Sequence, residues 1–248
     1  MKRPTLFSFL AVTLLLAMAC TRQKGFVVEG TLQGGAGKTV YFEEITPRDG
    51  ALRVGEATLD KHGRFSFRYD MPYQSFYNLH VSETDYVVLL PQQGETIRLS
   101  GCYDSLQVSY RVEGSPESTL LWQLQDYTNQ GLALLAALVA MDRENQQRYP
   151  DPKAYQAAKQ HTDSIFMEIH GQQVRYMQDF IDDNQGSLAT LIALYKPFNN
   201  HPLLPPESSA DYYEMVLQGL QDKLPDNPHT VNFKNTVAEV QYQYSRGQ

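Results

Sequence analysis

The spacing of hydrophobic residues changes once along the chain, near residues 114–117, and this change constrains the fold more than any other feature. Before it, apolar and polar side chains alternate, as in residues 64–69. After it, leucines recur at helical spacing, as in residues 120–138. A period of two is typical of half-buried strands, and a period near 3.6 of helices packed on one face. The sequence therefore predicts an α+β chain, with an antiparallel β-sandwich or barrel over residues 26–114 and an α-helical bundle over residues 115–248.

Two further alternating stretches, residues 77–81 and 106–112, are predicted as strands. Residues 60–63 and 92–95 have the composition of hairpin turns, with a glycine available for the left-handed backbone position. The pattern predicts about eight strands, at the spacing of roughly 8–12 residues that small sandwiches and barrels show.

Helix starts in the second half are marked by residues that cap the first free amides and by prolines, which suit the first helical position. These signals predict five helices, which begin near Ser115 with Pro116, Asp151 with Pro152, Ser187, Ser208 and Pro228. The longest apolar run there, residues 132–141, is shorter than the roughly 20 residues that a membrane span needs, so it is predicted as a buried helix.

The first twenty residues have the pattern of a bacterial lipoprotein signal peptide. A short basic segment precedes an apolar run over residues 6–18, and small residues lead up to Cys20. In such signals the cysteine is lipidated on sulfur, the peptide is cut before it and the new amine is acylated. We predict a signal peptide at residues 1–19, a lipid on Cys20 and a tether over residues 20–25. The alternative is an ordinary signal peptide that is cleaved before an incidental Cys20.

Charge bears on location and partners. The formal net charge of −7 argues against a nucleic-acid partner, because that affinity comes mainly from basic side chains on phosphates. No acidic run follows Cys20, which favours the periplasmic side of the outer membrane over surface export. The expected location is therefore the cell envelope, with the membrane reached through the N-terminal lipid.

The candidate motifs for cofactors and metals lack residues or spacings that such sites require. Residues 34–39 look like a phosphate-binding loop, but they lack its first glycine and precede a strand-like segment instead of a helix, so they are predicted as a glycine hairpin. His161 and His170 would face opposite sides of one helix, and two cysteines are too few for a four-thiolate zinc site. We expect no cofactor, no metal and no catalytic residues, and therefore a protein that is not an enzyme.

Individual polar residues receive structural predictions. Cys102 is expected to be buried and inert, His62 to lie in a turn, and His80 to face solvent from a strand. Glu43 and Glu44 are adjacent in a predicted strand, so they should point to opposite faces and not share a proton.

Tyrosine is mildly abundant, with sixteen in the chain. Most are predicted to be core or interface residues with a solvated hydroxyl. A tyrosine-lined groove for a peptide or glycan is the alternative.

Several short motifs together resemble the N-terminal domain of unknown function, and the helical spacer after it, in Bacteroidetes lipoproteins of the thiol-disulfide interchange type. They are Gly30-Thr31, Val40-Tyr41-Phe42, residues 63–67, residues 76–79, Leu90-Pro91, residues 94–97, residues 112–115 and, in the spacer, Phe180-Ile181 with residues 187–189. Such relatives usually continue into a thioredoxin-fold domain with a Trp-Cys-x-x-Cys site. This sequence contains no Cys-x-x-Cys, so the redox activity is not carried over.

The sequence thus predicts a lipid-anchored envelope protein that acts as a non-enzymatic binding or scaffold module. Its expected partner is a protein, a peptide or an envelope polymer. The alternative, which the resemblance implies, is an accessory subunit of periplasmic thiol-disulfide exchange that works with a separate thioredoxin-like protein. A hydrolase with dispersed catalytic residues is a third hypothesis.

Overall fold

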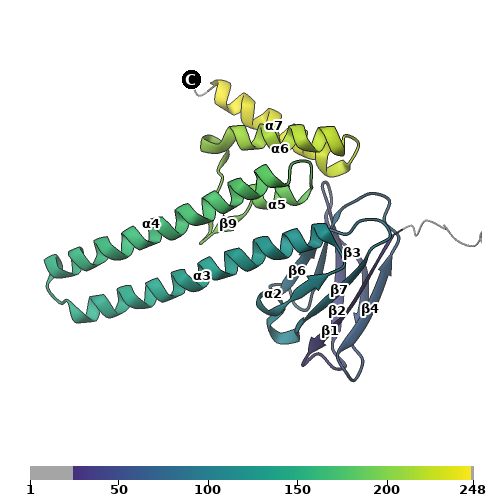
Figure 1. Ribbon diagram of the computed structural model, residues 1–248, viewed down its shortest axis with the longest axis horizontal. Coiled ribbons are helices and arrows are strands. Elements are labelled where there is room, and N and C mark those ends of the chain that lie inside the picture. Colours follow the sequence, from purple (N-terminus) through teal and green to yellow (C-terminus); the bar gives the residue numbers. More distant parts are fainter. Residues whose placement is uncertain (1–24, 247–248) are drawn as a thin grey trace, which may run out of the picture.

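The computed structural model describes residues 25–246, which form a two-sheet β-sandwich followed by a helical half (Figure 1). The predicted signal peptide and Cys20 lie outside the described residues. One sheet has the order β4-β1-β7-β8 and the other β3-β2-β5-β6. The strands are β1 (Phe26–Gln33), β2 (Thr39–Thr46), β3 (Gly50–Thr58), β4 (Arg64–Tyr69), β5 (Phe76–His80), β6 (Tyr86–Leu89), β7 (Thr96–Cys102) and β8 (Arg111–Glu113). The α+β prediction is confirmed, with sheets in the N-terminal part and helices after them.

The sandwich core follows from the alternation in the sequence. On β4, Phe65 and Phe67 are buried while the residues between and beside them are exposed. Phe42 of β2 stacks on Phe67 with ring centroids 3.9 Å apart, so this pair joins the two sheets. Burying one such side chain stabilises the fold by about 1.5–3 kcal/mol. The buried core consists of Phe26, Val28, Leu32, Val40, Phe42, Leu59, Phe65, Phe67, Met71, Tyr77, Leu79, Val87, Leu89, Ile97, Leu99, Leu106, Tyr110 and Val112.

Strand pairing departs from the prediction in two ways. β1 and β7 pair in parallel, whereas the other described pairs of the sandwich are antiparallel. The turns at residues 34–39, 60–63 and 92–95 are present, but each links strands of different sheets, so the hairpin predictions are wrong. Gly63 does take a left-handed conformation, with φ of +73°. Alternation shows which face of a strand is buried but not which strand lies beside it, and this explains the error.

The predicted strand over residues 106–112 is also wrong. Its first half forms the short helix α2 (Leu106–Ser109) after a 3₁₀ turn, η1 (Tyr103–Ser105), and the backbone is extended only from Tyr110 into β8. The Asp85 carboxylate accepts hydrogen bonds from the backbone N–H groups of Leu106 and Gln107, at 2.9 and 2.7 Å. These two amides have no partner within the helix, so a side chain distant in sequence caps it and overrides the local pattern.

The helical half contains α3 (Pro116–Arg148), α4 (Pro152–Asp183), α5 (Ala189–Leu194), α6 (Pro206–Lys223) and α7 (Pro228–Arg246), with a small hairpin, β9 (Pro197–Phe198) and β10 (His201–Pro202), between α5 and α6. Ser115 and Asp151 cap α3 and α4 as predicted, since their side chains accept from Ser118 N and Ala154 N. The helix predicted near Ser208 is present, but α6 begins two residues earlier, kinks at Ser209 and has no side-chain cap at its start.

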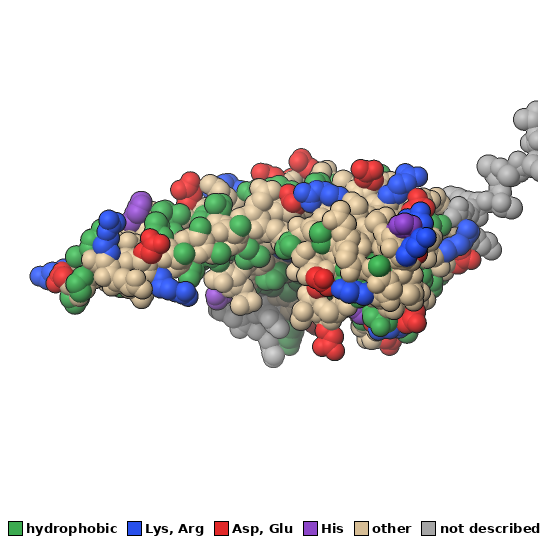
Figure 2. Space-filling view, turned by 90° about the horizontal axis from the view of Figure 1, so that it is seen from below, with side chains coloured by type: hydrophobic (Ala, Val, Ile, Leu, Met, Phe, Trp, Pro, Cys, Tyr) green, Lys and Arg blue, Asp and Glu red, His purple; other side chains and the backbone are tan. Residues whose placement is uncertain are grey.

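Helices α3 and α4 form an antiparallel arm that projects from the rest of the molecule (Figure 1). In its outer part each helix packs mainly on the other, so much of its surface faces solvent. Residues 132–141 are helical as predicted but only partly buried. Leu138 is 8% exposed, whereas Leu134 and Val139 are 55% and 50% exposed. Figure 2 shows apolar side chains on the surface of this arm. Within residues 25–246, no helix combines the length and apolarity needed to cross a membrane.

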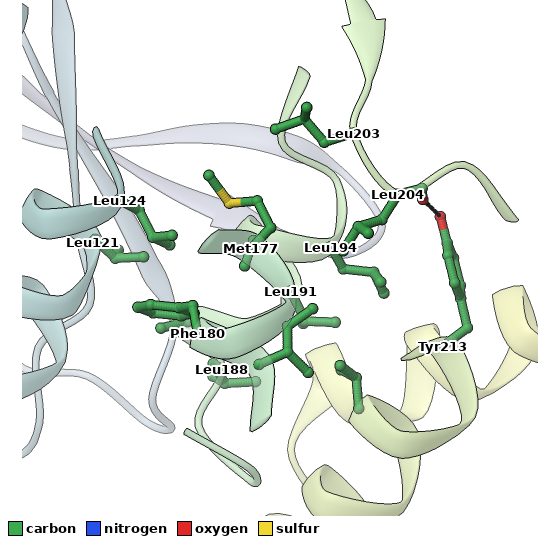
Figure 3. Packing of buried hydrophobic residues seen from close by; sticks show 14 of the residues in the cluster. Leu121, Leu124, Met177, Phe180, Leu188, Leu191, Leu194, Leu203, Leu204 and Tyr213 are labelled. Atoms are coloured by element: carbon green, nitrogen blue, oxygen red, sulfur yellow. Dashed lines mark hydrogen bonds between the residues drawn. The ribbon is translucent and has the colours of Figure 1, made fainter. Parts of the chain in front are cut away.

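A second core joins the helices to the sandwich. Figure 3 shows Leu121 and Leu124 of α3, Met177 and Phe180 of α4, and the leucines of α5 converging on one apolar cluster. Phe76 and Leu90, from the strand half, belong to this same cluster. Polar contacts accompany it, because Leu90 N donates to Ser118 Oγ at 3.0 Å. The outer face of the β2-β5-β6 sheet is therefore a packing surface for the helices.

Candidate functional site

A cavity of about 560 Å³ lies where the helical half meets the outer face of the β2-β5-β6 sheet. It falls within the roughly 300–1,000 Å³ that small-molecule sites occupy. Its wall consists of Ile45, Thr46, Pro47, Phe76, Tyr86, Val87, Val88, Gln107, Tyr110, Leu121, Gln125, Thr128, Asn129, Leu132, Leu191, Ile192, Tyr195, Lys196, Pro197, His229, Asn232, Phe233 and Thr236. Most of this wall is apolar or aromatic, and Lys196 is the single lysine among its described residues.

Lys196 is placed on this wall by the end of α5 and the hairpin that follows. Pro197 disfavours a helical conformation at the residue before it, so α5 stops just short of Lys196. Asn199 and Asn200 then take positive φ values of 50° and 64°, as a tight two-residue hairpin turn requires. Leu203 N donates to Lys196 O at 3.2 Å and closes this hairpin, which fixes the lysine backbone.

The Lys196 ammonium is held by a chain of neutral amides. Lys196 Nζ donates to Gln125 Oε1 at 2.7 Å. Gln125 Nε2 in turn donates to Asn129 Oδ1 at 2.8 Å, and Asn129 Nδ2 donates to Gln107 O at 3.3 Å. The contacts run from the segment after α5, across one face of α3, to α2. Gln125 accepts from the lysine through its oxygen and donates through its nitrogen to the oxygen of Asn129. These hydrogen bonds orient the ammonium without neutralising its charge.

The electrostatics of Lys196 are unusual for a half-buried lysine. Burial lowers its pKa from 10.5 to about 8, and no neighbouring carboxylate opposes this effect. Among the described residues, the cavity wall holds no Asp, Glu or Arg side chain. Lysines away from water are nearly always paired with an acid, because desolvating an ammonium is costly. At neutral pH the cavity therefore contains one positive charge with no negative partner of its own.

His229 also lines the cavity and lies at the start of α7. Its Nε2 is 3.0 Å from Ser75 Oγ, and its ring meets Phe76 edge to face. Burial lowers the pKa of His229 from 6.5 to about 4, so its imidazole is neutral near pH 7. Next to it, Asn227 Nδ2 donates to Gln74 O at 2.8 Å. These contacts hold the start of α7 against the segment before β5 and so fix the α7 part of the cavity wall.

A separate polar cluster surrounds Glu44 in the sandwich. Glu44 is 4% exposed, and its Oε2 accepts from the Tyr69 hydroxyl at 3.4 Å. Burial, with the nearby Glu44 carboxylate, raises the pKa of Tyr77. Glu43, on the other face of β2, instead pairs with Arg53 at 3.2 Å, so the two glutamates do point apart as predicted. Neither Glu44 nor Tyr77 lines the cavity.

The cysteine and the two histidines with individual predictions, Cys102, His62 and His80, lie away from the cavity, whereas Tyr86, Tyr110 and Tyr195 line it. Cys102, predicted to be buried, is a half-buried free thiol at the end of β7. His62 occupies an exposed turn as predicted. His80, predicted to face solvent, is half-buried and lies 3.3 Å from Glu43. No cluster of three or more potential metal ligands occurs within residues 25–246.

Sequence reasoning missed Lys196 and His229. Lys196 carried a usable signal, because it is the single charged residue in the mostly apolar stretch over residues 188–198. A charged side chain in such a stretch either lies in water at the end of a helix or belongs to a binding or active site. His229 carried no such signal, since its burial depends on Ser75 and Phe76, which lie more than 150 residues earlier.

Comparisons with known proteins leave the family open. No family model and no curated protein matches the chain. A crystal structure of (S)-allantoin synthase is similar at 13% sequence identity and a TM-score of 0.26. That alignment covers 42% of this chain and 48% of the other, so the match spans about half the length of that protein. At this TM-score the similarity supports no statement on fold or function.

Proposed function

We propose that this chain is a lipid-anchored, non-enzymatic binding protein of the bacterial cell envelope, and that its ligand occupies the cavity between the sandwich and the helices. The observation that carries the binding role is an open, mostly apolar cavity with a set of hydrogen-bonded polar groups on its wall. Lys196, Gln125 and Asn129 supply those groups from fixed positions.

The non-enzymatic part of the proposal rests on the chemistry of the wall. His229 and Lys196 are its groups with strongly lowered pKa values, and they come from separate elements, the start of α7 and the segment after α5. The hydrogen-bond partners of the two groups are neutral amides and Ser75, with no acid in contact. Among the described residues the wall holds no carboxylate to act as a general base beside them. Such an arrangement suits the capture of a ligand better than proton transfer to it.

The anchor is supported by the sequence pattern before Cys20. Its test is mass spectrometry of the N-terminal peptide of the protein made in its native host, together with fractionation of cells that carry Cys20→Ser. We expect a diacylated or triacylated Cys20 in membrane fractions and release of the variant from the membrane. An unmodified Cys20 would remove the anchor from the proposal.

The binding role is tested by filling the cavity. Thr236 of α7 lines it, whereas Ala238, two residues later, is exposed. A set of small apolar and amphipathic compounds is screened for a rise in the thermal denaturation midpoint of the wild type. Compounds that bind in the cavity should lose their effect in Thr236→Trp and keep it in the matched control Ala238→Trp. Hits that are unaffected by Thr236→Trp, or a screen with no hits, would contradict the proposed site.

A further inference from the structure

We infer that the ligand is an amphipathic monoanion, with an apolar body seated against the aromatic wall and one carboxylate-like head paired with the Lys196 ammonium. This inference rests on the proposed binding function and goes further by naming the class of ligand.

The first argument is the missing counter-ion. Elsewhere in the described chain, several basic groups at the surface pair with acids, for example Lys38 with Asp104 and Lys159 with Asp163, at 2.8 and 2.7 Å. Such exposed pairs contribute little, because water already solvates both charges. Lys196 is much less solvated and would gain far more from an anion, yet its side-chain partner is the neutral Gln125.

The second argument is the geometry of the ammonium. It has three N–H donors, and one of them is directed at Gln125 Oε1. The amide of Gln125 is itself fixed by its contact with Asn129, so the lysine head is held in place while two donors remain for a ligand. A charge that is positioned in advance binds an anion without the entropic cost of ordering a long side chain.

The third argument is the character of the rest of the wall, which sets the ligand's other end. Phe76, Leu121 and Phe233 line the cavity, and Tyr195, 49% exposed, borders it. A small inorganic anion would leave this apolar surface in contact with water. A polyanion such as a nucleotide would need several cations, but Lys196 is the single Lys or Arg on the described wall. An apolar body with one negative charge satisfies both parts of the site.

Ligand binding should depend on pH through Lys196. The other titratable side chains on the wall are Tyr86, Tyr110, Tyr195 and His229. Burial raises the pKa values of Tyr110 and Tyr195 and lowers that of His229 to about 4, so these three groups are neutral between pH 7 and 9. With a Lys196 pKa of about 8, the protonated fraction falls about tenfold over this interval.

The test compares two probes that differ only at the head group, 4-phenylbutanoate and 4-phenyl-1-butanol, by isothermal titration calorimetry with the wild-type protein. We expect the carboxylate to bind at least tenfold more tightly than the alcohol at pH 7. Its affinity should fall about tenfold between pH 7 and 9, while that of the alcohol stays constant. Both probes should lose binding in Thr236→Trp.

Lys196→Met should abolish the preference for the carboxylate and its pH dependence, while retained binding of the alcohol shows that the cavity is intact. Lys234→Met, which removes an exposed lysine of α7, serves as the matched control and should behave as wild type. Equal affinities of the two probes for the wild type, or an undiminished preference in Lys196→Met, would overturn the inference and leave the binding site standing. Failure of both probes to bind would overturn the inference together with the proposed function.

Discussion

Replacing Lys196 by methionine should make the unliganded protein more stable at neutral pH. A lysine whose pKa falls from 10.5 to about 8 is less favourable as a cation in the folded state by about 3 kcal/mol, at roughly 1.4 kcal/mol per factor of ten. Methionine removes this cost and keeps a flexible chain of similar length. Gln125 Oε1 then loses its donor, which costs about 1 kcal/mol. The expected net gain is about 1–2 kcal/mol at pH 7.

The pH dependence distinguishes this explanation from a simple packing effect. Below pH 8 the lysine is charged in both the folded and the unfolded protein, so the full cost is present. Between pH 8 and 10.5 the folded protein releases the proton while the unfolded chain keeps it, so wild-type stability rises with pH. The advantage of Lys196→Met should therefore shrink over this interval. Other titrating groups cancel in the difference between the two proteins.

The measurement is urea denaturation followed by circular dichroism, for both proteins at pH 7, 8, 9 and 10. A variant less stable than wild type at pH 7, or a difference that does not decline above pH 8, would refute the idea that Lys196 is a half-buried cation with no acidic partner.

Three further predictions concern other parts of the fold. His229 should make the protein acid-sensitive, because its imidazole takes up a proton near pH 6.5 in the unfolded chain and only near pH 4 in the folded protein. The free energy of unfolding should therefore fall by about 3 kcal/mol as the pH falls across this range. In thermal denaturation, the midpoint of His229→Gln should depend less on pH than that of the wild type. Asp85→Ala should destabilise the protein by about 1 kcal/mol in urea by removing the cap of α2, whereas the exposed Glu83→Ala should have no measurable effect. Gly63→Ala should cost more than Gly94→Ala in the same assay; both have a positive φ, but a Cβ at Gly63 would lie 2.3 Å from a backbone carbonyl oxygen and one at Gly94 would meet nothing within 4 Å, so equal costs would contradict the steric argument.

Helix starts could be predicted from the sequence because their signals are local. Ser115 and Asp151 cap helices through amides only three residues away, and Pro116 and Pro152 follow them directly. Strand partners could not be predicted in this way. The parallel pairing of β1 with β7 joins residues about 70 positions apart, and no pattern within either strand encodes it. The helix α2 was missed for a similar reason, since its cap, Asp85, lies outside the segment.

The cavity was beyond sequence reasoning because its parts are distant from one another. Lys196, Gln125 and His229 come from three separate segments, and only packing against the sheet brings them to one wall. The predicted class of fold is confirmed, whereas the lipid on Cys20 stays a prediction because that residue lies outside the described part. Chemistry carried by one local motif can be read from a single chain, but a site assembled from single residues of several elements cannot.

The arm of α3 and α4 has a mechanical consequence for the cavity. The inner end of α3 supplies Leu121, Gln125 and Asn129 to the wall, and its outer end at Arg148 lies roughly 20–27 residues further on, about 30–40 Å away at 1.5 Å per residue. The α3–α4 arm is thus attached to the rest of the molecule at an inner end that lies beside the cavity. A tilt of a few degrees at the root would move the tip by about 2–3 Å. A spectroscopic label near Tyr149 would therefore detect a tilt of α3 that accompanies ligand uptake.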